Sequence, residues 1–474
     1  MDAREFIICG KKKESDARLD VTNPYTDSVF DRICLCNEAH IEEAVSGALE
    51  AFKVTSILAG YEKMQILTKL AGLIEERKDE FIEILIMEGG KVRGLAAGEV
   101  DRAVETIKIS AEEAVRQTGE IIPLDRTEGG KGHTCFSRRF PVGPVLAITP
   151  FNYPLNLACH KIGPSMAAGN PFILKPASKT PLSALLLGEL VIEAGYPPEA
   201  VSVLPCTPVL AEKMVRDERI AFLSFTGSPD VGWHLRSIAG RKKVSLELGG
   251  NAAAIVHGDA DLDYAAQRIA TGACANAGQV CISVQRVFVQ DTIYRQFKEK
   301  LGSAFESLKC GDPLEPDTVV GPMVSKESAQ VAWNKVQIAL SAGTKIVSGG
   351  KFDGVSISPT ILEETTPGLE VNSTEIFAPV ITITSYEDFS DAIRMVNDSV
   401  YGLQAGVFTS GIEDAFYAYD NVKAGGVIVN DIPTFRVDMM PYGGVRMSGT
   451  GREGPAYAIE EMTEMKIMVL HRRQ

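Results

Sequence analysis

Five short apolar runs between residues 142 and 248 decide the fold of this chain. They are VGPVLAIT (142–149), FILKP (172–176), VSVL (201–204), AFLSF (221–225) and VSLEL (244–248). Segments of helical length lie between them, for example 182–194 and 230–239. Short apolar strands that alternate with helices form a parallel sheet covered on both faces. Because such connections are right-handed, we expect an α/β fold with a doubly wound parallel sheet.

The same pattern resumes on the C-terminal side. Apolar strands at 252–256, 284–289 and 379–384 predict a second α/β domain. On the N-terminal side, apolar residues recur at helical spacing and predict an amphipathic helix with one buried stripe. The stripe consists of Ile41, Ala44, Val45, Ala48, Leu49 and Phe52.

Two further segments indicate a small β element. Glycines and a proline punctuate short extended pieces between 118 and 139. A last strand at 465–470 has no helix after it, and we expect it to pair with this excursion or with another subunit.

Composition excludes several classes of protein. The 474 residues carry 62 acidic and 48 basic side chains, a net charge of −14, which argues against a nucleic-acid partner. We expect no membrane span, because no apolar run approaches about 18 residues. Nine scattered cysteines without a C-x-x-C pair favour the cytoplasm, and six dispersed histidines indicate no metal site.

Ligands of doubly wound sheets bind at the carboxyl ends of the strands, and polar residues follow several of the predicted strands. Asn152, between Pro150 and Pro154, is either a turn residue or a rigidly held amide donor for an oxyanion. Lys175 is either a solvated lysine or a cation that holds ribose hydroxyls. Glu247 ends an apolar strand, where a buried carboxylate needs a partner or a function.

Two more features are ambiguous when taken alone. The turn at 226–228 precedes a helix and fits either an ordinary capped helix or a phosphate site. A lone cysteine is more often a small buried residue than a nucleophile. Cys274 fits that interpretation, whereas Cys281, beyond the helix-breaking Gly278, fits it less well. The G-x-G-x-x-G match at 449–454 is dismissed, because no βαβ unit fits around it.

Seven motifs in a fixed order carry a resemblance to a known family. They lie at 150–154 (PFNYP), 175–178 (KPAS), 225–228 (FTGS), 247–250 (ELGG), 278–281 (GQVC), 375–379 (EIFAP) and 441–444 (PYGG). Together they resemble the aldehyde dehydrogenase superfamily over nearly the whole chain. The wider matches at 150–161 and 436–444 look most like its lactaldehyde, glyceraldehyde and phosphonoacetaldehyde dehydrogenases.

The resemblance implies the role of each motif. Cys281 would be the nucleophile, Glu247 the general base, and Asn152 an oxyanion donor beside the Cys281 backbone N–H. Lys175 and Glu375 would hold the adenine-side and nicotinamide-side riboses. The remaining cofactor contacts implied are Pro150, Phe151, Thr226, Gly227, Ser228, Leu248, Gly249 and Phe377.

The implied cofactor is NADP or NAD. Many relatives that prefer NAD carry a glutamate where this chain has Ser178, and Lys179 adds a positive charge beside it. Without the carboxylate, repulsion against a 2′-phosphate is absent. We therefore expect NADP to be accepted, ahead of NAD or alongside it.

The substrate is expected to be a small hydroxylated or anionic aldehyde. Val280 and Ile282 flank the nucleophile with apolar side chains. Arg102 lies where some relatives grip an anion, or else pairs with Glu99 or Glu105 on its own helix. The other substrate candidates are Tyr153 and His160.

The resemblance also implies an arrangement of domains and a homodimer or homotetramer. We expect a dinucleotide-binding domain at 1–117 and 140–247, a catalytic domain at 248–445, and an oligomerisation element at 118–139 and 446–474. Two alternatives stay open. One is a dehydrogenase that passes the acyl group to coenzyme A, against which Glu247 argues. The other is a non-catalytic protein with the same fold.

Overall fold

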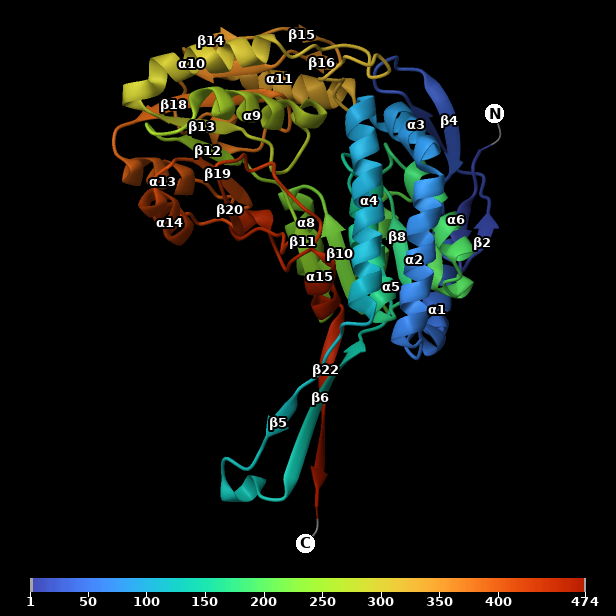
Figure 1. The fold of residues 1–474 in the computed structure, drawn as a ribbon. Helices are drawn as coiled ribbons and strands as arrows, with labels where there is room; N and C mark the ends of the chain where they lie inside the picture. Colours follow the sequence, from blue (N-terminus) through green and yellow to red (C-terminus); the bar gives the residue numbers. More distant parts are fainter. Residues whose placement is uncertain (1–2, 473–474) are drawn as a thin grey trace.

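The computed structural model describes residues 3–472, and its first unit is built on an eight-stranded sheet (Figure 1). The strands lie in the order β2 (Lys11–Lys13), β1 (Phe6–Ile8), β9 (Val201–Val203), β8 (Phe172–Lys175), β7 (Val145–Ile148), β10 (Phe222–Thr226), β11 (Lys243–Glu247) and β21 (Gly449–Thr450). The strands from β9 to β11 are parallel, and β1 and β21 pair antiparallel at the two sides. The strand order reverses at β7, which lies between β8 and β10, and this makes the sheet doubly wound.

Helices cover both faces of this sheet. One face carries α5 (Pro154–Ala168) and α6 (Leu182–Ala194), with α2 (Gly60–Glu76), α3 (Lys78–Gly89) and α4 (Arg93–Ala114) outside them. The other carries α1 (Glu38–Thr55), α7 (Pro208–Arg216) and α8 (Pro229–Ile238). Local sequence fixes the ends of α5, because Pro154 occupies its first turn and Gly169 ends it at a left-handed φ of 96°.

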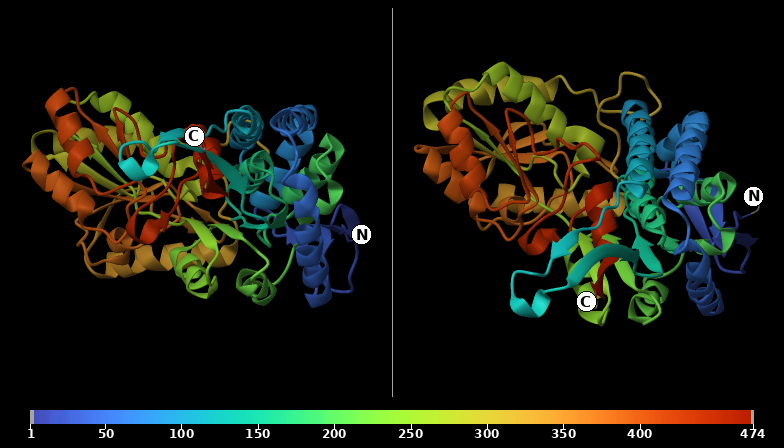
Figure 2. Two further views of the ribbon diagram at one scale, coloured as in Figure 1. Left: turned by 90° about the horizontal axis from the view of Figure 1, so that it is seen from below. Right: turned by 60° about the horizontal axis from the view of Figure 1, so that its bottom comes forward.

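The second unit is another α/β layer structure. Its sheet has the order β14 (Lys345–Ser348), β17 (Thr360–Glu363), β18 (Val380–Tyr386), β13 (Arg286–Gln290), β12 (Ala253–Val256), β19 (Gln404–Phe408) and β20 (Gly426–Val429). One face packs against α9 (Leu262–Cys274), α10 (Asp291–Glu306) and α11 (Lys326–Ser341), with the short α12 (Glu370–Ser373) nearby. The other packs against α13 (Phe389–Asn397) and α14 (Ile412–Asn421). Figure 2 shows the two units side by side.

A three-stranded arm projects from the body (Figure 1). Its strands are β5 (Ile121–Pro123), β6 (His133–Pro141) and β22 (Thr463–His471), in the order β22-β6-β5. The last strand therefore pairs with the excursion at 118–139, the first of the two partners considered. Between β21 and β22, α15 (Pro455–Glu461) packs against α4 and α5, so residues 449–461 lie on the body and not in the arm.

The remaining elements are short. Two small hairpins are formed by β3 (Arg18–Thr22) with β4 (Val29–Cys34), and by β15 (Phe352–Asp353) with β16 (Ser356–Ile357). Within residues 3–472, none of the helices is long and apolar enough to cross a bilayer.

The observed elements agree closely with the sequence pattern, and this confirms the predicted fold class. Each of the five apolar runs contains a strand, and helix 182–194 has the predicted bounds. One detail of the first helix is wrong: Leu49 is 41% exposed. It lies at the edge of the stripe around Ile41 and Ala48, where the sheet does not cover it.

Candidate active site

A cavity of about 280 Å³ lies at the carboxyl edge of the first sheet, where the strand order reverses. Asn152, Glu247 and Cys281 all line it, from three segments far apart in sequence. So do nine of the residues predicted for the cofactor, namely Pro150, Phe151, Thr226, Gly227, Ser228, Leu248, Gly249, Glu375 and Phe377. Sequence reasoning did not select four further lining residues, Leu157, Arg436, Tyr442 and Glu453.

The segment before Cys281 has an unusual backbone. Asn276 and Ala277 have φ values of 50° and 54°, and Gly278 follows at 71°. Left-handed non-glycine residues are strained and persist only where their surroundings impose them. A Cβ on Gly278 would collide with the Ala378 carbonyl, so this turn needs glycine there. The turn ends α9 and brings Cys281 into the cavity.

The Cys281 thiol is partly buried beside a tyrosine. Its Sγ lies 3.0 Å from Tyr442 Oη. Burial raises the pKa of Cys281 to about 12, although the Tyr442 hydroxyl opposes this shift. The thiolate is the nucleophilic form, so the resting thiol needs a base or a change of environment before it attacks.

Asn152 is held from both of its ends. Its Nδ2 donates to the Gln279 carbonyl at 2.9 Å, which leaves its second amide hydrogen for another acceptor. The backbone carbonyl oxygen of Asn152 accepts hydrogen bonds from Lys91 Nζ at 2.7 Å and from Asn276 Nδ2 at 3.3 Å. The amide is thus tied to the segment that carries Cys281.

Glu247 ends β11 and is 3% exposed. Neither of its carboxylate oxygens has a hydrogen-bond partner within residues 3–472. Burial and the neighbouring Glu453 raise its pKa well above the usual value, against the opposing effect of Arg436 and Lys161. A raised pKa means that this carboxyl group keeps its proton to higher pH than an ordinary glutamate does, and it can act as a base once it has lost the proton.

A buried network of charged groups adjoins the cavity. Glu453 accepts from Lys161 Nζ and from Arg436 Nη2, each at 3.0 Å. Burial alone would raise its pKa, but these two cations hold it at about 2. Arg436 also lies 3.7 Å from the centre of the Tyr442 ring. Its buried Nε has no hydrogen-bond partner in the described part of the chain.

The residues at the other end of the cavity fit a dinucleotide. Thr226, Gly227 and Ser228 precede α8, whose N-terminal backbone N–H groups favour a phosphate. Glu375 Oε1 accepts from the Gly250 N–H at 3.1 Å, and a Cβ on Gly249 would collide with the same carboxylate. A side chain at Gly249 would therefore have to displace the Glu375 carboxylate.

An aromatic pair completes this end of the cavity. Phe377, at a φ of 56°, meets Phe151 edge to face at 5.9 Å between ring centres. The edge of the sheet, the glycines and the two rings together provide surfaces for phosphate, ribose and an aromatic base.

Two of the predicted cofactor residues lie outside the cavity lining. Lys175 ends β8 beside β7, at the same carboxyl edge of the sheet. Burial lowers the pKa of Lys175, and it has no ion-pair partner within residues 3–472. Ser178 and Lys179 are exposed in the loop that follows.

The predicted substrate residues fall into two groups. Tyr153, Val280 and Ile282 pack in one apolar cluster with Cys281 and Tyr442. They lie beside the cavity but are not among its lining residues.

Arg102 and His160 instead share a carboxylate behind the cavity. Arg102 Nη2 and His160 Nε2 each lie 2.7 Å from Asp438 Oδ1. The alternative prediction, that Arg102 pairs with Glu99 or Glu105, is therefore wrong. The loop at 431–442 brings Asp438 to the face of α4 that carries Arg102.

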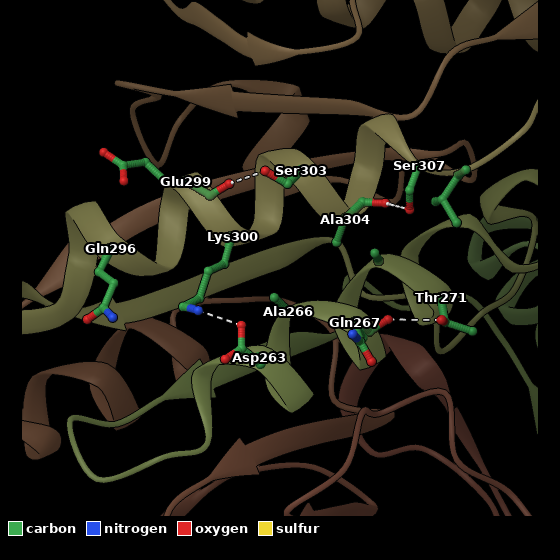
Figure 3. Close-up of a pocket in the computed structure, with 12 residues that line it drawn as sticks. Asp263, Ala266, Gln267, Thr271, Gln296, Glu299, Lys300, Ser303, Ala304 and Ser307 are labelled. Carbon is green, nitrogen blue, oxygen red and sulfur yellow. Dashed lines mark hydrogen bonds and ion pairs between the residues drawn. The ribbon is translucent and has the colours of Figure 1, made fainter.

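A larger cavity of about 840 Å³ lies away from this site, between α9 and α10 (Figure 3). Its side chains pair with one another, as in the Lys300–Asp263 ion pair at 2.5 Å. None of the predicted site residues lines it.

Comparison with known proteins gives a consistent result. The aldehyde dehydrogenase family model matches residues 11–468. A 3-sulfolactaldehyde dehydrogenase of Priestia aryabhattai is 45% identical over 467 residues, 98% of each chain. The crystal structure of aldehyde dehydrogenase 21 from Physcomitrella patens with the reaction product succinate has a TM-score of 0.97, 40% identity and 99% coverage of each chain.

A second solved structure carries a cofactor. The glyceraldehyde-3-phosphate dehydrogenase GapN from Methanocaldococcus jannaschii, complexed with NADP, has a TM-score of 0.92 and 36% identity. The match covers 97% of this chain and 100% of that one.

The chain belongs to the aldehyde dehydrogenase family, as its ordered motifs predicted. The fold and the comparisons define it further as an NAD(P)-dependent aldehyde dehydrogenase.

Proposed function

We propose that this enzyme oxidises a small anionic aldehyde to its carboxylic acid through a covalent intermediate on Cys281. The observation that carries the proposal is a single cavity lined by a thiol, an amide, a carboxyl group and a buried guanidinium. These are Cys281, Asn152, Glu247 and Arg436. A rate panel of short charged and neutral aldehydes with each dinucleotide tests it directly.

The chemistry follows from the positions of these side chains. The Cys281 thiol gives its proton to water, and the thiolate sulfur then attacks the aldehyde carbon, while the free amide hydrogen of Asn152 stabilises the oxyanion that forms. When bound, the nicotinamide ring supplies the acceptor for the hydride that leaves this carbon. Glu247 then takes a proton from the water that hydrolyses the Cys281 thioester. A buried carboxyl group in the cavity favours hydrolysis over transfer to coenzyme A.

An anionic substrate is supported by the local balance of charge. Lys161, Arg436 and Arg102 are cations, and their two carboxylate partners, Glu453 and Asp438, have lowered pKa values because of these pairings and the contact with His160. Burial raises the pKa of Glu247, which favours its neutral form. Among the five paired groups, three cations face two carboxylates, which leaves an excess of one positive charge. The relatives are named for sulfolactaldehyde and glyceraldehyde-3-phosphate, and one binds succinate.

Arg436→Met tests the anion contact. We expect kcat/KM for succinic semialdehyde to fall about 10- to 100-fold, because a buried hydrogen bond to a charged group contributes about 1.5–3 kcal/mol. Butanal, which has the same number of carbons and no charge, should lose less, because only the effect of Arg436 on Glu247 and Glu453 is removed for it. Initial rates with both aldehydes give the comparison.

Arg102→Met is the matched variant, since Arg102 lies outside the cavity lining and is paired with Asp438. We expect a smaller loss than for Arg436→Met. Equal losses on both aldehydes, or a larger loss at Arg102, would contradict the assignment of Arg436.

We also propose that NADP is used at least as well as NAD. Ser178 and Lys179 are exposed after β8, next to the strand end that carries Lys175. Ser178→Glu should lower kcat/KM for NADP about 10-fold or more, because it places a carboxylate against the 2′-phosphate. The value for NAD should change less than about threefold. A parent enzyme more than a hundredfold better with NAD would contradict this proposal.

The assembly we propose is a homodimer or homotetramer built through the arm. Apolar residues on both faces of β22 are about half exposed, and they offer surface for a second copy. These residues are Met465, Ile467, Met468, Val469 and Leu470. We place the dinucleotide-binding domain on the first sheet, the catalytic domain on the second, and the enzyme in the cytoplasm, in keeping with its free cysteines.

A further inference from the structure

We propose that Lys91 is a positioning residue for the oxidation step: its ammonium group fixes the peptide carbonyl of Asn152 and thereby the amide that serves the oxyanion. The inference rests on the proposed function, because it assigns Lys91 an effect that passes through Asn152. Lys91 touches neither the substrate nor the reacting sulfur in this account.

The contacts of Lys91 converge on the residues that follow β7. The Lys91 side chain is 2% exposed and its Nζ donates to Asn152 O at 2.7 Å. The same ammonium pairs with Glu99 and lies 3.8 Å from the centre of the Tyr153 ring. Burial lowers the pKa of Lys91, an effect that Glu99 opposes. One of the three contacts of this buried cation is therefore made to a peptide carbonyl of the active-site loop.

Glu99 fixes the other side of the same loop. Its Oε1 accepts from the backbone N–H groups of Leu155 and Asn156, at 3.0 and 3.2 Å. These N–H groups open the first turn of α5, where an unpaired donor needs an acceptor. The Lys91–Glu99 pair therefore holds the loop at two places. Lys91 holds the carbonyl of Asn152, and Glu99, from α4, holds the first turn of α5.

Within the described residues, the other buried Lys–Glu pair beside the cavity, Lys161 with Glu453, makes no hydrogen bond from its lysine to a peptide carbonyl. Lys161 pairs with Glu453, and its other hydrogen bonds go to the hydroxyls of Ser224 and Thr226. A buried pair needs further hydrogen bonds to be tolerated, but side-chain hydroxyls suffice for that purpose. The Lys91 contact with a peptide carbonyl in the active-site loop is thus a separate feature.

The amide of Asn152 follows its backbone. The Asn152 carbonyl also accepts from Asn276 Nδ2 at 3.3 Å, so Lys91 and Asn276 fill both of its acceptor positions. Without Lys91, this carbonyl keeps only the longer contact from Asn276 Nδ2, so the peptide unit after Asn152 is less tightly held and the side-chain amide can shift with it. A misplacement of about 1 Å in a catalytic group can cost about 100-fold in rate.

The experiment uses the double substitution Lys91→Met with Glu99→Gln in the full-length enzyme. The glutamine keeps a carbonyl oxygen for the two N–H groups of α5, and no unpaired charge stays buried. We expect the single-turnover rate of NADPH formation to fall about 10- to 100-fold. The KM for NADP should change less than about threefold. Glu99→Gln alone separates the two members of the pair: it removes the carboxylate but leaves Lys91 able to donate an N–H to Asn152, so we expect it to keep more of the single-turnover rate than the double substitution does.

A cycle with Asn152→Ala separates positioning from a general structural effect. If Lys91 acts through Asn152, the double substitution should cost less than about twofold in the Asn152→Ala background. If the double substitution instead lowers the single-turnover rate by the same factor in the Asn152→Ala background as in the parent enzyme, the inference is wrong. Should the methionine variant fail to fold, Lys91→Gln with Glu99→Gln replaces it in the same cycle, since glutamine is too short to restore the contact.

The same cycle distinguishes failure of the proposed function. If Asn152→Ala by itself leaves NADPH formation at the parent rate, the oxyanion role of Asn152 fails. If Asn152→Ala slows this step and the Lys91 variants do not, only the present inference fails.

Discussion

Replacing Cys281 by alanine is expected to lower kcat by at least about 10⁴-fold, with no burst of NADPH in the first turnover. The sulfur lines the cavity beside Asn152 and Glu247, and alanine leaves no atom to bond to the aldehyde carbon. Binding of NADP should be kept within about threefold, because the cofactor end of the cavity does not use this side chain. Stopped-flow absorbance and a fluorescence titration measure the two quantities.

Cys274→Ala is the matched control for this experiment. Cys274 lies seven residues earlier, buried inside α9, and has no place in the cavity lining. We expect its kcat to stay within about twofold of the parent. A Cys281→Ala enzyme that keeps more than about 1% of the parent activity would refute covalent catalysis at this sulfur.

Glu247→Gln should separate the two halves of the reaction. We expect a burst of about one NADPH per subunit at nearly the parent rate, followed by turnover slowed about 10²- to 10⁴-fold. Glutamine fills the same space but cannot take a proton from water, so the thioester accumulates. Mass spectrometry of the quenched enzyme should find the acyl group on Cys281, and added hydroxylamine should restore turnover.

The raised pKa of Glu247 gives this step a pH dependence. Burial and Glu453 favour the protonated form, and only the deprotonated form can act as a base. The parent kcat should therefore rise with pH over a range that lies above the titration of an ordinary glutamate, and Glu247→Gln should remove that rise. Loss of the burst in the glutamine variant, or turnover at the parent rate, would be incompatible with the role proposed for Glu247.

The sheet and most of the site residues could be predicted because they depend on local sequence. Lys175 and Glu247 end largely apolar strands, and parallel strands that end at one edge bring such residues together. Gly278 breaks the helix before Cys281 and moves this cysteine away from the buried positions of that helix. These features need only a few neighbouring residues to be recognised.

Arg436 and Tyr442 stand in the matched stretch at 436–444, but neither they nor Glu453 could be given a role from the sequence. Their environment is assembled from α5, from the loop at 431–442 and from the segment before α15. The partner of Arg102 likewise lies 336 residues away, at Asp438. Pairings over such separations leave no periodic signal in the sequence, so the charge network became visible only with the fold.

The short strand β21 connects the arm to the residue proposed as the base for thioester hydrolysis. Gly449 pairs with Glu247 in the sheet register, and the same stretch of chain continues through α15 into β22. A displacement of the arm when two copies associate would thus act, through α15 and β21, on the end of β11 that carries Glu247. Shortened versions of this protein that omit the final strand should be tested for both thioester breakdown and hydride transfer, because α15 also packs against α4 and α5.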